Sequence, residues 1–129
     1  MNNAHGDFEV KLVPQSAADA LIGRMSIDKQ FHGDLVGVSK GQMLVAGTEI
    51  KTSAGYVAIE RISGTLHERS GSFVLQHSGI MTATSQQQNI AVVPDSGAGQ
   101  LAGLTGKMTI TIAAGKHSYD FEYMLPGES

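Results

Sequence analysis

Apolar and polar residues alternate at every second position through most of this chain, and glycine-rich breaks interrupt the alternation. This period is typical of β-strands with one buried face, because successive side chains of a strand point to opposite sides. The pattern predicts eight strands, over residues 7–14, 24–32, 35–45, 55–66, 72–81, 87–94, 106–113 and 116–125. One helix is predicted, over 16–22, where Ser16 and Asp19 have capping-box spacing and Gly23 can end it.

The connections between the predicted strands are too short for the crossover helix that parallel neighbours need, so we expect antiparallel neighbours. Eight such strands leave two exposed edges unless the sheet closes on itself. The chain has 16 glycines in 129 residues, and those inside predicted strands allow the bends of a small barrel. We therefore predict an all-β fold, a closed or nearly closed eight-stranded antiparallel meander β-barrel. It forms a single domain over 1–129, with an ordered core over about 7–125.

Charge and composition exclude several classes of function. The 9 basic and 12 acidic residues give a net charge of −3, and the basic residues are scattered, so we expect no nucleic-acid partner. The sequence shows no signal peptide and no membrane-spanning apolar stretch, which together with the absence of cysteine indicates a cytoplasmic protein. The five histidines lack metal-ligand spacing, so neither a metal site nor a cofactor is predicted.

Two short motifs match known catalytic or cofactor patterns, but their surroundings do not. Residues 37–41 spell GxSxG, yet a nucleophile elbow needs a strand, a turn and a helix, whereas Ser39 lies within a predicted strand. Residues 97–102 match the loose dinucleotide pattern GxGxxA, but a strand follows them instead of a helix. Neither motif therefore indicates a hydrolase or a nucleotide-binding protein.

The fourth and fifth predicted strands form a hairpin around the loop 68–71. Gly71 is expected to adopt the left-handed conformation that closes this loop, and His67 is expected to pair with Ser72. Because side chains alternate between the two faces of a sheet, this pairing also decides which residues of the two strands share a face.

Glu60 and His77 share the more aromatic face of this hairpin, as diagonal neighbours within hydrogen-bonding reach. If this face lines the barrel, the pair can bind a polar ligand group or move a proton. Burial would raise the pKa of Glu60, and a paired histidine would oppose that shift. Two alternatives stay open: the two side chains satisfy each other's hydrogen-bonding groups inside the core, or the face points outward and both side chains are solvated.

Aromatic residues add further candidates for a ligand site. Tyrosine hydroxyls can serve as polar groups of a pocket, although core packing is the commoner role of such residues. The candidate ligand-binding residues are Glu60, His77, Tyr56, Tyr119, Tyr123 and Phe31. The opposite face of the hairpin carries Val57, Ile59, Val74 and Ile80 around Arg61 and Gln76, which suggests a self-association surface and a dimer or trimer.

Four sequence blocks carry a resemblance: GDLVGVSKG at 33–41, YVAIERISGTL at 56–66, GSFVLQHSG at 71–79 and VVPDSGAGQLAGLTG at 92–106. Through them the chain resembles an uncharacterised bacterial family of small β-barrel proteins. The last block is also similar to the glycine-rich hairpin of allene oxide cyclase and dirigent-like barrels. That likeness implies an eight-stranded antiparallel barrel of the calycin-like type with a cavity, assembled as a homo-oligomer. No residue here matches the catalytic motif of the cyclases, so none of their site residues is carried over.

Three hypotheses of function follow. In the first, the barrel binds a small, largely apolar molecule, and Glu60, His77 and the tyrosines hold its polar end. In the second, the protein is a cofactor-free cyclase or isomerase with Glu60 as general acid or base. In the third, it is a structural oligomer without a ligand. Binding ranks first because it requires only a cavity, and whether the protein is an enzyme stays open.

Overall fold

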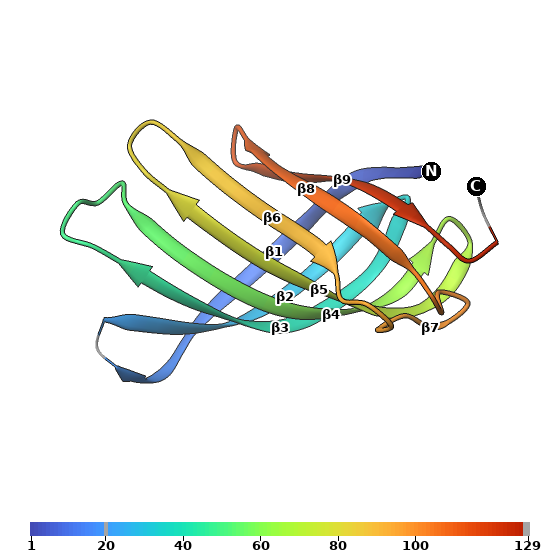
Figure 1. Cartoon of the computed structure of the whole chain (residues 1–129), viewed down its shortest axis with the longest axis horizontal. Helices are drawn as coiled ribbons and strands as arrows, with labels where there is room; N and C mark the ends of the chain where they lie inside the picture. The colour runs from blue at the N-terminus through green and yellow to red at the C-terminus, as the bar shows by residue number, and fades with distance from the viewer. Residues whose placement is uncertain (20, 128–129) are drawn as a thin grey trace.

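Over residues 1–19 and 21–127, which this computed structural model describes, the chain forms nine β-strands and no helix (Figure 1). The strands are β1 (Asn2–Asp19), β2 (Ile22–Gly33), β3 (Leu35–Gly47), β4 (Ala54–Leu66), β5 (Arg69–Met81), β6 (Gln86–Val92), β7 (Ala98–Gly99), β8 (Thr105–Ala113) and β9 (Lys116–Met124). Because the described residues form no helix, they include no helix that could cross a membrane.

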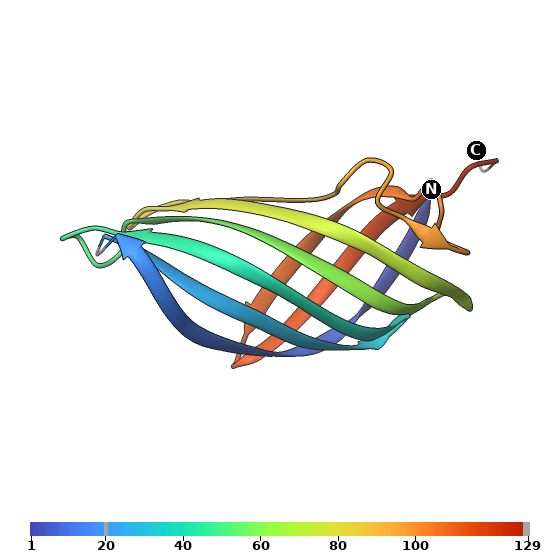
Figure 2. The ribbon, with the colours of Figure 1, turned by 90° about the horizontal axis from the view of Figure 1, so that it is seen from below.

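Eight of the strands close into a ring in the order β1, β2, β3, β4, β5, β6, β8, β9, with β9 paired to β1. All of these pairings are antiparallel, and each strand lies beside its neighbours along the chain. Figure 2 shows the strands wrapping around a common interior. The two-residue strand β7 pairs with β5 outside the ring. The predicted eight-stranded antiparallel meander barrel is confirmed.

The predicted helix over 16–22 is wrong. Strand β1 continues to Asp19, which pairs with Ile22 at the start of β2, so this region is the end of a long hairpin; Ala20 lies outside the described residues. A two-turn helix is marginal in water, because few hydrogen bonds offset the cost of nucleating it. Pairing with β2 gives the same backbone groups partners in an existing ladder.

The predicted turn at 68–71 is also wrong. Strand β4 ends at Leu66 and β5 begins at Arg69, leaving a two-residue turn in which His67 and Glu68 have φ angles of 45° and 70°. Positive φ at both positions is the geometry of a type I′ hairpin. Gly71 lies within β5, where a Cβ atom would come 2.1 Å from the carbonyl oxygen of Ala98. The absence of a side chain at this position therefore allows β7 to pack closely against β5.

The hairpin register differs from the prediction by an even number of residues. Ser72 pairs with Ser63 instead of His67. Because side chains alternate with a period of two, an even shift leaves every side chain on its predicted face. The face that carries Glu60 and His77 is therefore grouped as expected, and its burial shows that it points into the barrel.

The two ends of the barrel differ. At the end that holds the β4–β5 turn, Leu101 and Leu104 from the β6–β8 connection are buried and join the aromatic core. At the opposite end, which we call the mouth, β9 pairs with β1 only as far as Phe8, and the β8–β9 hairpin stops short of the other hairpins (Figure 1). Strands β6 and β8 share one bridge, between Ala91 and Lys107. The barrel is thus filled at one end and open at the other.

Candidate ligand-binding chamber

A row of polar side chains crosses the interior on four adjacent strands. Lys29 of β2, Ser39 of β3, Glu60 of β4 and His77 of β5 are exposed by 9, 2, 0 and 5%, respectively. Each occupies an inward position of its alternating strand, and Lys29 lies directly opposite Ser39 in the β2–β3 pairing. Burial of polar groups costs free energy unless they have partners, so this row needs a physical explanation.

Glu60 is the centre of the row. Lys29 Nζ donates a hydrogen bond of 2.7 Å to Glu60 Oε2, and His77 Nε2 lies 2.6 Å from the same oxygen. The predicted proximity of Glu60 and His77 is confirmed, and they are diagonal neighbours because Leu75 lies opposite Glu60. The ring N–H of His77 is not well aligned with the oxygen, so this close contact falls short of a well-formed hydrogen bond. Glu60 Oε1 is buried and has no hydrogen-bond partner among the residues that the structure describes.

The electrostatics of Glu60 follow from these contacts. Burial by itself would raise the pKa of its carboxyl, but His77 and Lys29 outweigh that effect and lower the pKa from 4.5 to about 2. Glu60 is therefore a carboxylate at neutral pH. A group with so low a pKa is a poor general acid and a weak general base near pH 7, because catalytic groups work best with a pKa near the operating pH.

Lys29 is the member of this cluster that the sequence analysis missed. Its ammonium lies 4.8 Å from the ring centroid of Phe8 and 5.8 Å from that of Phe31, which adds cation–π attraction to its ion pair. A signal was present in the sequence, because Lys29 shares the alternating inward face of the strand with Ile27 and Phe31. A lysine at such a position needs a buried anion.

A chamber of about 140 Å³ lies above this cluster, on the side of the mouth. All eight strands of the ring contribute to its wall, which consists of Phe8, Val10, Leu12, Ile27, Lys29, Met43, Tyr56, Ala58, His77, Gln88, Ile110 and His117. Glu60 is not part of the wall and lies behind Lys29 and His77. An apolar cavity of about 150 Å³ can hold one benzene molecule, so this chamber has room for a ligand of that size.

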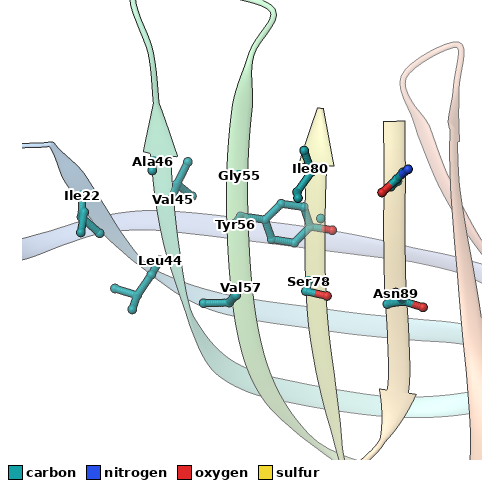
Figure 3. Close-up of a pocket in the computed structure, with 12 residues that line it drawn as sticks. Ile22, Leu44, Val45, Ala46, Gly55, Tyr56, Val57, Ser78, Ile80 and Asn89 are labelled. Atoms are coloured by element: carbon teal, nitrogen blue, oxygen red, sulfur yellow. The ribbon is translucent and has the colours of Figure 1, made fainter. Parts of the chain in front are cut away.

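Two larger hollows, each of about 520 Å³, lie over the outward face of β2 to β6. Figure 3 shows one of them, with Leu44, Val57, Ser78 and Asn89 in a row across adjacent strands. The four side chains of this row point away from the buried cluster, while Ala58 and His77 border both the second hollow and the chamber. We take the smaller chamber as the candidate site because the buried charges border it.

The structure divides the other predicted site residues between the two ends of the barrel. Tyr56 lines the chamber, and its hydroxyl accepts a hydrogen bond of 2.9 Å from Gln88 Nε2. Phe31, Tyr119 and Tyr123 pack in the core of the filled end. The structure thus brings Glu60, His77 and Tyr56 together and places the other three away from the mouth.

Tyr119 stabilises the filled end of the barrel through hydrogen bonds of its hydroxyl group. Its hydroxyl donates a hydrogen bond of 2.8 Å to the carbonyl oxygen of His32 and accepts one of 2.9 Å from the backbone N–H of Leu35. Burial raises the pKa of this hydroxyl, which stays protonated at neutral pH. These bonds hold the β2–β3 turn against β9, which is a structural role.

Comparison with known proteins places the chain in a family. Residues 4–123 match the family described as "Protein of unknown function (DUF3224)". The chain belongs to the DUF3224 family. A solved structure of a DUF3224 protein with unknown function from Shewanella oneidensis MR-1 is 47% identical, covers 99% of each chain and superposes with a TM-score of 0.94. A search of curated proteins finds no match. The resemblance to an uncharacterised family of small barrel proteins is confirmed, and DUF3224 is that family.

Proposed function

We propose that this DUF3224 barrel binds one small, largely apolar molecule of about the size of benzene. The observation that carries this proposal is a chamber of about 140 Å³ that is walled by all eight ring strands and bordered by buried charges. The apolar wall favours the body of the ligand, whereas Lys29 and His77 offer polar contacts to one end. This division of a pocket into apolar walls and a few placed polar groups is typical of small-molecule sites.

The buried charges favour binding over a purely structural role. Replacing a buried ion pair by apolar side chains of similar volume is often neutral or stabilising, because burial removes the charges from water. If the interior served packing alone, apolar residues of similar volume would stabilise the barrel at least as well as Lys29 and Glu60. Their position beside an open chamber supports a role towards a ligand.

The cyclase or isomerase alternative is less well supported. It needs a proton donor or acceptor near neutral pH, and the pKa of Glu60, lowered to about 2, does not suit that role. Glu60 also lies behind the chamber wall. In a catalytic version of this site, His77 would have to move the proton and Glu60 would orient it.

Toluene tests the binding proposal, because it fits the chamber and carries no polar group. It is expected to bind the wild-type protein and to raise its melting temperature with increasing concentration, since a ligand that binds only the folded state stabilises it. Calorimetric titration and a thermal unfolding series measure both effects. If the wild-type protein bound neither toluene nor phenol, which carries a hydroxyl group on the same ring, the proposed function would be rejected.

Two matched variants locate the bound toluene. Ala58→Leu adds three carbons to the chamber wall and is expected to abolish binding, whereas Val57→Leu, at the next position of β4, adds one carbon on the outer face and leaves binding unchanged. The opposite result, with binding lost only in Val57→Leu, would place the ligand in the outer hollow and contradict the proposal.

A further inference from the structure

The two ring nitrogens of His77 have different surroundings. Nε2 contacts the carboxylate of Glu60, whereas Nδ1 has no hydrogen bond among the described residues. His77 also lines the chamber. Nδ1 is therefore the polar atom through which this side chain can bind a ligand.

Glu60 determines which nitrogen carries the proton. At 2.6 Å from an ionised carboxylate, Nε2 must be protonated, because its lone pair would otherwise face the negative charge. In the neutral ring, Nδ1 then carries the lone pair and is a hydrogen-bond acceptor. A carboxylate fixes the tautomer of a histidine in the same way in catalytic triads.

Lys29 supplies the complementary donor. Its ammonium has three N–H groups, and its hydrogen bond to Glu60 uses one of them. Lys29 and His77 both line the chamber, which has a volume of only about 140 Å³, so one small ligand group can reach both side chains. A ligand group that satisfies both must donate one hydrogen bond and accept another.

We propose that the ligand of this chamber carries a hydroxyl group on its apolar body, as a small phenol does. The hydroxyl donates its hydrogen to His77 Nδ1, and its oxygen accepts from Lys29 Nζ. This inference rests on the proposed binding function and adds the chemical class of the ligand. Glu60 is a positioning residue in this scheme, because it orients both partners without touching the ligand.

Phenol, anisole and toluene test this arrangement, because they share one ring and differ in the polar group. Phenol both donates and accepts, anisole only accepts, and toluene does neither. Calorimetric titration of the wild-type protein is expected to show phenol binding about 10-fold more tightly than either of the others, a difference of about 1.4 kcal/mol. Equal affinities for phenol and anisole would overturn the role of His77 Nδ1 as acceptor.

A histidine variant adds a second, independent measurement. His77→Leu is expected to reduce the affinity for phenol to the affinity that the same variant has for toluene, so that the roughly 10-fold preference for phenol disappears. His32→Leu is the control, because His32 Nε2 also contacts a glutamate, Glu9, at 3.1 Å, but on the outside of the barrel. It is expected to change neither affinity.

The outcomes separate the two proposals. If toluene and phenol bind the wild-type protein equally well, the hydroxyl inference fails and the binding function stands. If neither binds, the binding function itself fails. A preference for phenol that persists in His77→Leu would also overturn the inference. The comparison of phenol with anisole uses only the wild-type protein, so it decides the question even if the variant does not fold.

A second observation concerns the outside of the barrel. We name as the outer apolar face five side chains on β2 to β5 that are between 43 and 62% exposed: Ile22, Leu44, Val57, Ile59 and Ile80. The strand register makes them neighbours: Leu44 lies opposite Val57, and Gln42 lies opposite Ile59. Serine, asparagine and glutamine side chains border them in the two hollows. An apolar centre with a polar border is the usual anatomy of a protein interface.

The charge and area of this face fit a second copy of the chain. Among the residues that line the two hollows, Arg24 is the one with a formal charge at neutral pH, and Lys40 and Arg61, which lie opposite each other on β3 and β4, are outside the hollows. From strand spacing and repeat, the outward face of β2 to β6 measures about 20 Å by 30 Å. That area approaches the roughly 800 Å² that each partner buries in a standard interface.

We infer that two copies pack through the outer apolar face as a two-fold dimer, in which each copy presents the same surface. Sedimentation equilibrium of the wild-type protein is expected to give a dimer, and Ile59→Lys, which sets two like charges face to face, a monomer. Thr109→Lys places the same charge on exposed β8 and is expected to leave the dimer intact. A wild-type monomer or trimer, or a dimer that survives Ile59→Lys, would overturn this inference.

Discussion

Glu60→Gln is expected to lower the free energy of unfolding by about 3–5 kcal/mol, because it leaves the ammonium of Lys29 buried without a countercharge. The side chain of Lys29 is 7% exposed, and Glu60 supplies its ion pair. The variant keeps the shape of the side chain, so the loss reports charge and not volume. Urea unfolding of both proteins measures the difference.

The same carboxylate predicts a pH dependence. Since the folded-state pKa of Glu60 is about 2 and its ordinary value is 4.5, its contribution to stability is fully present above about pH 4.5 and disappears as the pH falls towards 2. This linkage amounts to roughly 3 kcal/mol, which agrees with the cost expected for the variant. Glu60→Gln should therefore lose less stability than the wild type between pH 5 and pH 2.

Two further variants make the interpretation specific. Lys29→Met combined with Glu60→Gln removes both charges and is expected to recover most of the lost stability, because neither charge remains unpaired. Glu9→Gln breaks an exposed contact with His32 and should cost less than about 1 kcal/mol. A double variant that is no more stable than Glu60→Gln would contradict the electrostatic explanation.

Gly41→Ala is expected to destabilise the barrel by about 1–3 kcal/mol or more, the cost of overpacking a site that cannot relax. A Cβ atom at this position of β3 would lie 2.2 Å from the carbonyl oxygen of Ile59 and 2.7 Å from the Cα atom of Glu60. Both atoms belong to the backbone of β4, so the two strands would have to separate beside the buried charge cluster. Thermal unfolding detects the loss of stability.

Gly47→Ala is the control for this prediction. Gly47 is the last residue of the same strand, and a Cβ atom there would meet no atom within 4 Å. The change is expected to leave stability unchanged or to raise it by about 0.4–1 kcal/mol, because alanine restricts the unfolded chain. Equal destabilisation by both substitutions would show that glycine flexibility, and not the close approach of β4, matters at Gly41.

The barrel was predictable because its signal repeats. A period of two in every segment and short connections decide both the strand class and the meander order. The grouping of Glu60 with His77 survived an error in the turn, because an even shift of register preserves the faces. Burial and pairing patterns that depend only on alternation are therefore recoverable from the sequence.

Features that depend on contacts between distant segments were not predictable. The type of turn at His67 and Glu68 follows from two positive φ angles at residues that rarely adopt them, and Gly71 is explained by a β7 contact that local patterns do not reveal. The role of Lys29 could not be predicted, because its partner Glu60 lies on β4 and the inward side chains of β2 and β4 meet across β3. Local helix signals at 16–22 likewise lost to pairing with a neighbouring strand.

A single pair of residues, Ala91 and Lys107, joins β6 to β8 and closes the barrel. Parting β6 from β8 breaks less backbone pairing than parting any other neighbours in the ring, so the lowest-energy opening of the native wall runs along this line.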